Sequence, residues 1–458
     1  MRLKRQCLTG SAVAASLLLG ACQSQLPASG ASGDSAVADV PTARTASISD
    51  QDISDAYIYL LGRLLVARQQ QLDFRDGMTW NQLVHRKPGE VLWPNPNLDV
   101  AYSEAWMAVD ETSCSIVTVP AIKGRYYTVH VLNGWGETLA NINERTYPDQ
   151  PAGDFAFCLK GANVSLPANV RRVDLPARYT RILARVELGA DWKQAEALQH
   201  RVTLRATGTP RLPQLPKTPM FELRQLPGVE AFEAAGEALA EPDLNPGMAP
   251  MQAKVRAIAD AIRDPAERTR VDGVIRQRAF ADFARASRTI GPGTTRNGWT
   301  RAAVSGAYGS DYLTRTLFNY GGIWVNTFDE ANYYRGAADS TGAMLDSSQT
   351  YTVTFPRDRL PAGEARYFWS VLAVDSKTFR VLPNPMNRFI LNNQSGLQYG
   401  KDGSLTLYFG PQKPAQAPES NWLPTPAGQQ YRLMLRFYGP KDQERARNYT
   451  PPPILKVS

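Results

Sequence analysis

The chain has 458 residues, which is enough for two or three folded domains. Hydrophobic residues make up 43% of it and charged residues 21%, and these globular values argue against wholesale disorder, a coiled coil or a protein with many membrane spans. The formal net charge is +8, but the cations are dispersed along the chain without long runs, which argues against a nucleic-acid-binding arm.

The N-terminus is typical of an exported bacterial protein. A basic start at residues 2–5 precedes an apolar stretch over 8–19 that is too short to span a bilayer comfortably. Residues 19–22 have the sequence Leu-Gly-Ala-Cys, which resembles a bacterial lipobox. In such a lipoprotein Cys22 is diacylated and becomes the first residue of the mature chain. An ordinary signal peptide with an incidental cysteine is the alternative.

We therefore predict a lipoprotein signal peptide over 1–21 and a flexible tether over 22–48, where Ser, Ala, Gly and Asp dominate and large apolar side chains are scarce. Gln23 follows Cys22 where Asp would indicate retention in the inner membrane, and this pattern resembles sorting to the outer membrane. The predicted location is the periplasmic face of the bacterial outer membrane, with the lipid on Cys22 as the membrane anchor.

Residues 49–208 are predicted to form an N-terminal helix and a β domain. Ser49 and Asp52 resemble an N-cap box, and apolar side chains with helical spacing predict a helix over about 50–70. Short β-like runs between Gly, Pro, Asn and Asp turns then predict a sandwich or barrel, with a short helix near the end. The predicted strands are 99–109, 115–119, 126–132, 155–159 and 181–187, and the predicted helix is 190–202.

Two cysteines remain in this domain once the leader is removed and Cys22 carries lipid. Cys114 and Cys158 could pair in an oxidising compartment. In the chain-entropy model, closing a loop of this length stabilises the fold by about 4 kcal/mol. The alternative is a pair of buried free thiols in neighbouring strands, and the sequence leaves both open.

Residues 209–340 are predicted to be a proline-rich crossover followed by helices. Four prolines between 210 and 219 indicate an extended segment, and helical periodicity appears over 229–239, over 251–262 and after Pro265. One or two further short helices are predicted over 311–337.

Residues 341–458 are predicted to form a second β domain. Its predicted strands are 350–355, 367–374, 404–409 and 431–438. The predicted fold class is therefore mixed α and β (α+β), with two antiparallel β-sandwich or barrel-like domains joined by a helical region.

Several motifs resemble a pair of families of unknown function, the domains of unknown function 1254 and 1214, over about residues 50–455. For the first family the motifs are WPNPNLDVAYS (93–103), GRYYTVH (124–130), ANIN (140–143) and GDF (153–155). For the second they are NYYR (332–335), FWS (368–370), NPMNR (384–388), DGSLTLY (402–408), NWLP (421–424) and RFYGP (436–440). Pro96 and Leu98 depart from the usual run of the first family. The resemblance implies two β-rich domains with helices between them and no agreed activity.

The motifs of the common catalytic classes are missing from the sequence. The three histidines, His85, His130 and His200, are far apart and lack metal-ligand spacing, and neither a Walker-type phosphate loop nor a GxSxG elbow occurs. We expect no metal and no cofactor. His130 alternates with Tyr126 and Thr128, which favours a structural histidine over a catalytic one.

The first candidate site is the loop and strand that include Asn95, Asn97, Asp99 and Tyr102. These amide, carboxylate and phenol groups could bind sugar hydroxyls or place a general acid. In the alternative, Asn and Asp build an Asx turn before a strand and Tyr102 lies in the core.

A second polar cluster contains Trp135, Asn143 and Glu144, and Glu144 could join Asp99 as the paired carboxylates of glycoside chemistry. A third contains four residues of the C-terminal loops. There an arginine could grip an anion and a tryptophan could stack on a sugar, or the residues could brace the loops. The four are Asn387, Arg388, Asn421 and Trp422.

Two functions fit these observations. In the first, an envelope lipoprotein binds a glycan, peptidoglycan or another polar ligand. In the second, a glycan-acting hydrolase or transferase uses Asp99 or Glu144 as acid or base. One pocket that holds two carboxylates would favour the enzyme, whereas surfaces rimmed by Trp and Arg would favour binding. Because no complete catalytic motif occurs, binding is the preferred hypothesis; no nucleic-acid partner is expected, and a homo-oligomer is left open.

Overall fold

The computed structural model describes residues 48–89, 94–426 and 428–457. The predicted signal peptide, the lipidation site Cys22 and all of the predicted tether before residue 48 lie outside these residues. Within the described ranges, no helix combines the length and the apolar character needed to cross a membrane.

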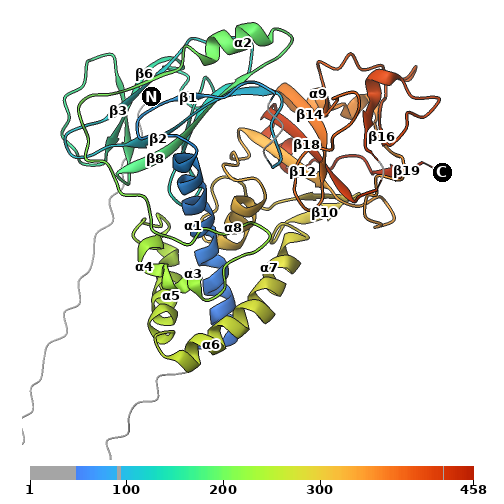
Figure 1. The fold of residues 1–458 in the computed structure, drawn as a ribbon. Coiled ribbons are helices and arrows are strands. Elements are labelled where there is room, and N and C mark those ends of the chain that lie inside the picture. Colours follow the sequence, from blue (N-terminus) through green and yellow to red (C-terminus); the bar gives the residue numbers. More distant parts are fainter. Residues whose placement is uncertain (1–47, 90–93, 427, 458) are drawn as a thin grey trace, which may run out of the picture. The chain divides into compact units, whose positions relative to one another are not determined.

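Two open sheets form the N-terminal β domain (Figure 1). Side chains from their facing sides, among them Met107, Val117, Phe155 and Ile182, pack in one core, so the domain is a sandwich. The helix α2 (Trp192–Gln199) lies against β2 and β8. One sheet has the order β1 (Val84–His85), β2 (Val100–Ala108), β8 (Tyr179–Glu187), β4 (Tyr127–Leu132), β5 (Thr138–Ile142), and the other β7 (Arg171–Leu175), β6 (Gly153–Leu159), β3 (Ser115–Val119), β9 (Thr203–Ala206).

The helix α1 (Asp50–Arg75) begins in the helical region, where Asp50 pairs with Arg270, and ends at the N-terminal β domain, where Asp73 pairs with Arg181 (Figure 1). The Ser49 hydroxyl accepts from the Asp52 amide at 3.1 Å, as the sequence predicts for an N-cap. The middle of α1 is buried on all sides, because other helices surround it and share an apolar core with it. These are α3 (Glu230–Glu233), α4 (Ala235–Ala238), α5 (Ala249–Ala261), α6 (Pro265–Val274), a π-helical turn (Ile275–Ala279), α7 (Phe280–Ser287) and α8 (Tyr312–Gly321).

Two further open sheets form the C-terminal β domain. Tyr351, Val353, Leu433 and Leu435 belong to its apolar core. The first sheet has the order β10 (Thr294–Arg296), β11 (Trp299–Arg301), β12 (Ala331–Gly336), β18 (Tyr431–Pro440), β14 (Ala365–Asp375), β15 (Ile390–Asn392). The second has the order β17 (Trp422–Pro424), β16 (Leu405–Gly410), β13 (Tyr351–Phe355), β19 (Leu455–Lys456). The short helices α9 (Pro361–Glu364) and α10 (Gln443–Asn448) complete the domain.

The predicted α+β class with two β domains and helices between them is confirmed, and two of its details are corrected. The sheets are open, so neither domain is a barrel. Most strand pairs are antiparallel, but β6 pairs with β7 and β16 with β17 in parallel, because the connections between them return the chain in the same direction.

The prediction of one or two helices over 311–337 is half wrong. The segment begins with α8 but continues into β12, which pairs with β18 along its whole length in the middle of a sheet. Tertiary pairing decides the conformation of such a short segment. The strands β10, β11 and β12 therefore belong to the C-terminal sheet, although they precede the boundary predicted at 340.

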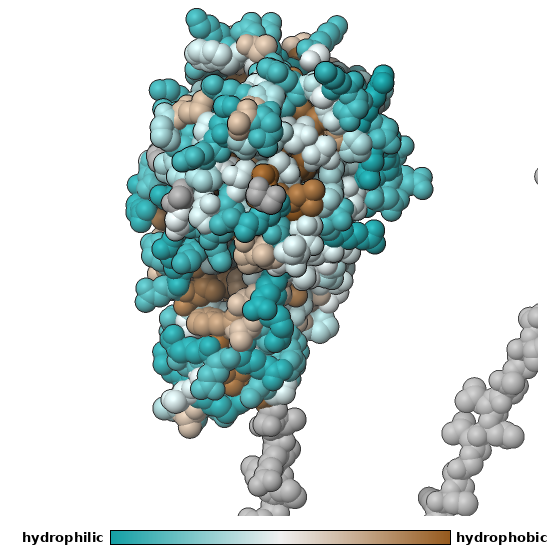
Figure 2. All heavy atoms as spheres, turned by 90° about the vertical axis from the view of Figure 1, so that its right-hand side faces the viewer, coloured by the Kyte–Doolittle hydropathy of each residue, from teal (hydrophilic) through white to brown (hydrophobic). Residues whose placement is uncertain are grey.

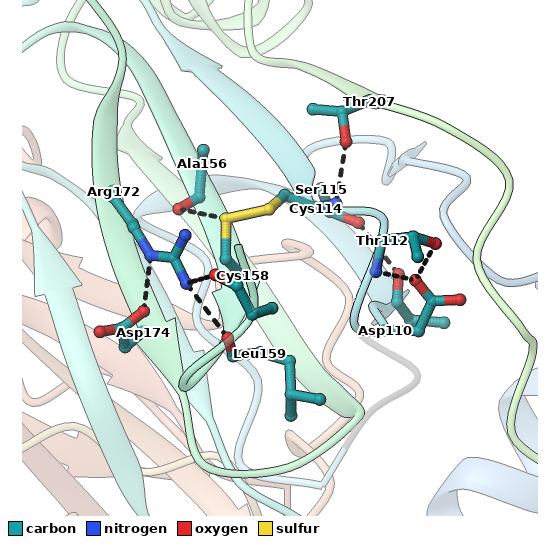
Figure 3. Close-up of a disulfide and its surroundings, with 12 residues drawn as sticks. Asp110, Thr112, Cys114, Ser115, Ala156, Cys158, Leu159, Arg172, Asp174 and Thr207 are labelled. Carbon is teal, nitrogen blue, oxygen red and sulfur yellow. Dashed lines mark hydrogen bonds and ion pairs between the residues drawn. A yellow bond between two sulfur atoms is a disulfide. The ribbon is translucent and has the colours of Figure 1, made fainter. Parts of the chain in front are cut away.

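Cys114 and Cys158 form a disulfide, so of the two alternatives the structure has the bonded one (Figure 3). Cys114 precedes β3 and Cys158 lies in β6, and the antiparallel register of these strands brings their Cα atoms to 4.5 Å. Both side chains are buried beside Ile116 and Ala156.

The face of the molecule that lies on the right of Figure 1 is mostly hydrophilic, and hydrophobic residues show on it only as separated patches (Figure 2). The large hydrophobic side chains that are exposed are spread over different parts of the chain. Apolar side chains in the described part of the chain therefore serve mainly the cores.

Candidate functional site

A cavity of about 540 Å³ lies where the two β domains meet α8. The N-terminal domain lines it with residues of β2 and β8, and the C-terminal domain with residues of β12 and β18. The end of α8 and the segment up to residue 325 form a further wall. A smaller cavity of about 180 Å³ adjoins it and shares Asn95, Asn97, Tyr102 and Arg185 with it.

The alternation of β18 divides its side chains between the core and this cavity. Tyr431, Leu433, Leu435 and Phe437 point into the C-terminal core. Because neighbouring residues of a strand point to opposite faces, the residues between them share the other face. Those residues are Arg432, Met434, Arg436 and Tyr438, and all four line the cavity.

The neighbouring strands follow the same rule. On β12, Tyr334 joins the core while Tyr333 and Arg335 line the cavity. On β8, the even-numbered residues from 182 to 186 join the N-terminal core, and Arg185 lines the cavity opposite Tyr102 of β2. Each β domain thus buries one face of its sheet in its own core and turns the other face toward the shared cavity.

The described residues of the cavity wall carry charges of one sign only. Among the described residues that line the cavity there is no aspartate or glutamate, but there are six cationic side chains. Positive charge without a compensating carboxylate favours an anionic occupant. The six are Arg185, Arg224, Arg335, Lys377, Arg432 and Arg436.

Arg185 is held in place by neutral groups. Its Nη1 donates to Nδ1 of His130 at 3.0 Å and to Oδ1 of Asn326 at 3.2 Å, and its Nη2 donates to the carbonyl of Trp324 at 3.0 Å. Since Nδ1 of His130 accepts, Nε2 carries the hydrogen and donates to the Thr138 hydroxyl at 2.8 Å. Burial, followed by the charge of Arg185, lowers the pKa of His130 well below its ordinary value. His130 is therefore a neutral positioning residue, as its alternation in the sequence suggests.

Arg335 and Arg432 crowd one another at another part of the wall. Arg335 lies opposite Met434 in the β12–β18 register, so Arg432 is its diagonal neighbour on the same face. The Nε atoms of both side chains are buried without a hydrogen-bond partner, and neither side chain forms an ion pair with any described residue. Burial and then the charge of Arg432 lower the pKa of Arg335 to about 10. Burial also lowers the pKa of Arg432, and the negative charge of Asp375 opposes this lowering.

The backbone of the wall is strained at several points. Among the described residues, four that are neither Gly nor Asn have positive φ, and all four line this cavity. Such backbone conformations cost free energy in bulky residues and gather at functional sites. They are Ile290 (φ 56°), Ile323 (φ 25°), Trp324 (φ 56°) and Phe379 (φ 58°).

Three residues of the first predicted site lie in this wall. Asn95 has φ 48° and donates through Nδ2 to the carbonyl of Gly321. Asn97 donates through Nδ2 to the Tyr438 hydroxyl at 2.7 Å, and its Oδ1 accepts from the amide of Asp99 at 3.0 Å. The Asx turn weighed as an alternative is therefore present, and the same turn brings Asn95, Asn97 and Tyr102 to the cavity.

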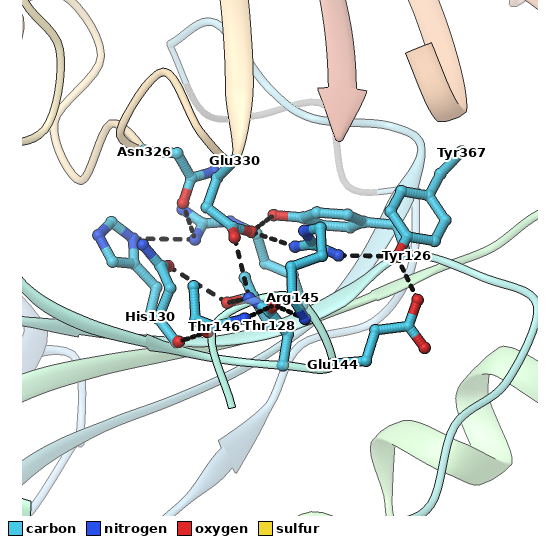
Figure 4. A network of polar contacts seen from close by, with 12 residues as sticks. Tyr126, Thr128, His130, Glu144, Arg145, Thr146, Asn326, Glu330 and Tyr367 are labelled. Atoms are coloured by element: carbon cyan, nitrogen blue, oxygen red, sulfur yellow. Dashed lines mark hydrogen bonds and ion pairs between the residues drawn. The ribbon is translucent and has the colours of Figure 1, made fainter. Parts of the chain in front are cut away.

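The two candidate carboxylates do not line the cavity. Asp99 is buried and accepts from Nδ2 of Asn392 at 2.7 Å. Glu144 accepts from the Tyr367 hydroxyl (Figure 4). It also accepts from Nη2 of Arg366 at 3.1 Å. The structure thus gives each carboxylate its own partners in a different place.

Asn143 belongs to a polar network that joins the two β domains (Figure 4). Its centre is Glu330, which precedes β12 and whose side chain is only 1% exposed. The Glu330 carboxylate accepts from Nδ2 of Asn143 at 2.9 Å, from the Tyr126 hydroxyl at 3.0 Å and from Nη2 of Arg145 at 2.5 Å. These bonds fasten β4 and the turn after β5 to the C-terminal domain.

The remaining candidates make structural contacts away from the cavity wall. Trp135 is fully buried against Tyr59 in the helical core. In the C-terminal domain the Trp422 carbonyl accepts from Nη1 of Arg388 at 3.1 Å, and Nδ2 of Asn421 donates to the carbonyl of Thr406 at 2.9 Å. These contacts brace the loops, which is the structural alternative that the sequence left open for this cluster. Asn387, with φ 49°, shapes the turn before Arg388.

The arginines of the cavity are not among the site residues that the sequence predicts. The signal was present in β18, where Arg432, Met434, Arg436 and Tyr438 alternate with four apolar residues. Arg335 and Arg436 also stand inside two of the motifs that resemble the second family. An outward-facing arginine is ordinary on an exposed sheet, so only the docking of the other domain gives it significance.

Among the described residues, no group of three or more His, Cys, Asp or Glu side chains is close enough together to hold a metal ion. His85 and His200 do meet, with ring centroids 4.4 Å apart, but they form only a pair.

Two family models match the sequence and confirm the predicted pair of domains. Protein of unknown function (DUF1254) matches residues 80–206, and Protein of unknown function (DUF1214) matches residues 330–442. No curated protein matches the chain.

The fold is also similar to solved structures. The VPA0106 protein from Vibrio parahaemolyticus is similar with a TM-score of 0.62 and 21% identity, over 89% of this chain and 100% of its own. An uncharacterised protein from Burkholderia cenocepacia gives a TM-score of 0.43 and 14% identity, over 88% of this chain and 87% of its own. At this level of identity the Vibrio structure shares the fold alone.

Proposed function

Given that the chain is a two-domain protein that joins a DUF1254 domain to a DUF1214 domain, we propose that it is a lipid-anchored binding protein of the bacterial cell envelope and that it binds an anionic ligand between these domains. The observation that carries the proposal is the cavity of about 540 Å³ with six cationic side chains and no described carboxylate in its wall. Acidic glycans and peptidoglycan fragments are negatively charged ligands of the cell envelope.

The location rests on separate observations. Leu-Gly-Ala-Cys22 resembles a lipobox, and Gln23 resembles the outer-membrane sorting pattern. The disulfide between Cys114 and Cys158 is typical of proteins outside the reducing cytosol. The lipobox and sorting patterns support a protein held by lipid on Cys22 at the periplasmic face of the outer membrane, and the disulfide supports its export.

The alternative is a hydrolase or transferase that acts on glycans. It requires two carboxylates on either side of one glycosidic bond. Asp99 and Glu144 are engaged with separate partners and neither lines the cavity, so the geometry favours binding over glycoside chemistry.

The test is calorimetric titration of the full-length protein with glucuronate, a muropeptide that carries free carboxylates, and inorganic phosphate, with glucose as the neutral counterpart of glucuronate. We expect at least one anion to bind, with an affinity that falls as salt is added. Arg335→Gln and Arg432→Gln should each weaken that binding about tenfold or more, because each removes a charged hydrogen-bond donor.

The matched control is Arg263→Gln, since Arg263 is 82% exposed and pairs with Asp260 outside the cavity. It should leave the affinity unchanged. Glucose binding as tightly as glucuronate, or the absence of saturable binding for all three anions, would refute the proposal.

A further inference from the structure

We propose that the ligand of this cavity is a compact polyanion, which carries two or more acidic groups close together rather than one acidic group alone. This inference rests on the proposed function, and it adds the number and the spacing of the negative charges. The arrangement of the arginines on the adjoining strands β12 and β18 carries it.

Three arginines lie next to one another on the face that β12 and β18 turn toward the cavity. Arg335 of β12 pairs with Met434 of β18, and Tyr333 pairs with Arg436. On one face of an antiparallel pair, the diagonal neighbours of a residue lie two positions before and after its partner, about 7–8 Å away and within reach of long side chains. Arg432 and Arg436 are therefore both diagonal neighbours of Arg335. Their three positive charges face one short stretch of the cavity.

These three arginines have no counter-charge of their own. Within the described part of the chain, no ion pair involves Arg335, Arg432 or Arg436. Arg335 donates through Nη2 to the carbonyl of Arg288, and Arg436 donates to two carbonyls of the N-terminal domain, but carbonyls leave the positive charges uncompensated. The Nε atom of each arginine is buried without a hydrogen-bond partner, so three donors stay unsatisfied.

Two carboxylates act on the three arginines from outside the cavity wall. The charge of Asp375 acts on Arg432, but Asp375 lines an adjoining cleft of about 670 Å³ and accepts from the amide of Thr378 at 2.6 Å. Asp99 interacts with the charge of Arg436, but burial raises the pKa of Asp99 and so favours its neutral form. These carboxylates therefore offset only part of the positive charge.

Arg185 of the N-terminal domain adds a fourth positive charge beside the same surface. Its Nη1 donates to Oδ1 of Asn326 at 3.2 Å, and Nδ2 of Asn326 donates to the Tyr333 hydroxyl at 3.2 Å. Tyr333 lies two residues before Arg335, on the same face of β12. Its phenol oxygen accepts one bond and keeps its own O–H to donate to another group. The cationic surface is thus continuous from β8 to β18.

The number of adjoining charges decides which occupant fits. An anion with a single charge would leave at least three of these four arginines without a counter-charge in a partly buried wall, where repulsion is strong. This repulsion already contributes to the lowered pKa of Arg335, through the charge of Arg432. Several acidic groups close together would offset it. Guanidinium groups bind carboxylate and phosphate oxygens alike, so the ligand class is a compact polycarboxylate or polyphosphate.

The experiment is calorimetry on the full-length protein at neutral pH and constant ionic strength, with anions of increasing charge as probes. Butyrate, succinate and tricarballylate carry one, two and three carboxylates on short carbon chains, and suberate carries two that are far apart. We expect tricarballylate to bind about tenfold or more tightly than butyrate, and succinate to bind more tightly than suberate.

Phosphate and pyrophosphate distinguish the two sources of acidic groups. A tenfold or larger preference for pyrophosphate over phosphate, without a preference for tricarballylate over butyrate, would support the inference and identify the acidic groups as phosphates. The converse result would support it and identify them as carboxylates.

Two sets of variants separate charge from shape. Arg335→Gln should reduce the advantage of tricarballylate over butyrate to about threefold or less, because it removes the arginine that neighbours the other two. Met434→Glu places a carboxylate opposite Arg335 and should bind tricarballylate about tenfold less tightly than Met434→Gln, which has the same shape without the charge. Both positions are only partly buried, and each set tests the inference independently of the other. Arg263→Gln should leave every affinity unchanged.

The outcomes separate this inference from the proposed function. If butyrate binds as tightly as tricarballylate and phosphate as tightly as pyrophosphate, one acidic group is enough and the inference is wrong, while anion binding stands. Tighter binding of suberate than of succinate would also overturn it, because the favoured charges would then be far apart. If none of these anions binds, and neither glucuronate nor the muropeptide binds, the proposed function fails and the inference fails with it.

Discussion

Asp99 shows how one residue can belong to a sequence motif without reaching the site that the motif builds. Its neighbours Asn95 and Asn97 line the cavity, but its own carboxylate turns away and meets Asn392 of the C-terminal domain at 2.7 Å. Burial raises the pKa of Asp99, and Ser370, Asn392 and the charge of Arg436 oppose that rise only in part. The residue therefore joins the two domains, and its charge carries a cost at neutral pH.

The raised pKa of Asp99 predicts how its loss changes the pH dependence of stability. The folded protein holds the proton to a higher pH than the unfolded chain, whose Asp99 titrates near 3.8. Its stabilising contribution is therefore complete below that pH and is lost as the pH rises through the folded-state pKa. Asp99→Asn cannot ionise, so its free energy of unfolding relative to wild type should improve as the pH rises above 3.8 in urea titrations.

Asp110→Asn is the control of opposite sign. The amide of Arg211, followed by Thr112 and Ser113, lowers the pKa of Asp110 to about 2. The folded protein therefore releases this proton first and gains stability above the unfolded pKa. Asp110→Asn should lose stability relative to wild type as the pH rises from about 2 to 3.8, which is below the range in which Asp99 titrates. Equal pH profiles for the two variants would contradict both assignments.

At the scale of elements, the contact between α1 and α8 positions one wall of the cavity. Gly62 of α1 faces Thr316 of α8, whose hydroxyl donates to the carbonyl of Ile58 at 2.9 Å. Asn319 of α8 donates to the carbonyls of Gly62 and Trp135, each at 3.0 Å. The glycine lets the two helices approach, and the strained segment that follows α8 then reaches Arg185.

Gly62→Ala should lower the free energy of unfolding by about 1–3 kcal/mol, because the new Cβ overpacks the contact between the helices. The added Cβ would lie 2.5 Å from the Thr316 hydroxyl oxygen, which a β-branched side chain cannot easily move. Denaturant unfolding of the purified variant measures the change.

Gly273→Ala in α6 is the matched control, because a Cβ at Gly273 would meet no atom within 4 Å. There the better helix propensity of alanine should raise the free energy of unfolding by up to about 1 kcal/mol. If both alanines stabilise the protein, α1 and α8 can move apart and the close contact is not required.

At the scale of the whole molecule, the two β domains have separate cores and are held together by aromatic and polar contacts. Tyr126 of the N-terminal domain packs against Tyr438 with ring centroids 5.1 Å apart, beside the Glu330 network. Arg436 and Asn392 add polar contacts from the C-terminal domain. Because these contacts surround the cavity, its geometry depends on the docking of both domains.

The proposed lipid anchor would act on the whole protein, and Cys22→Ser tests whether it exists. We expect this variant to lose incorporation of labelled palmitate and to leave the membrane fraction, because the acylated thiol is gone. Cys7→Ser is the control, since Cys7 lies within the predicted signal peptide and is removed with it. Label that persists in Cys22→Ser, or that disappears in Cys7→Ser, would contradict the predicted anchor.

Patterns that depend on neighbouring residues could be read from the sequence. The apolar spacing of 53–65 predicts α1, and the alternation of 431–438 predicts β18. The family motifs predict the pair of domains. The segment 311–337 could not be read in this way, because a lone short strand such as β12 carries a weak local signal and its conformation follows from pairing with β18.

The residues of the candidate site also divide into those that the sequence predicts and those that only the tertiary structure brings together. Asn95, Asn97 and Tyr102 were selected because polar groups concentrate in one short loop, and all three line the cavity. Arg185 and Arg432 stand far apart in the sequence, and each resembles an ordinary outward-facing residue of a sheet. Their convergence is invisible without the docking of the domains.

The amino-acid sequence by itself determined the secondary-structure periodicity and the two β domains, and it contains the motifs that predict export and lipidation. Each of these depends only on residues that are close together in the sequence. Only the tertiary structure decided that the polar faces of two sheets meet, that their arginines have no described carboxylate between them, and that Asp99 and Glu144 lie outside that space. The reason is that the cavity is formed by the surfaces that remain after each domain has buried its own core. Local sequence patterns specify the cores, but they do not specify how the domains dock.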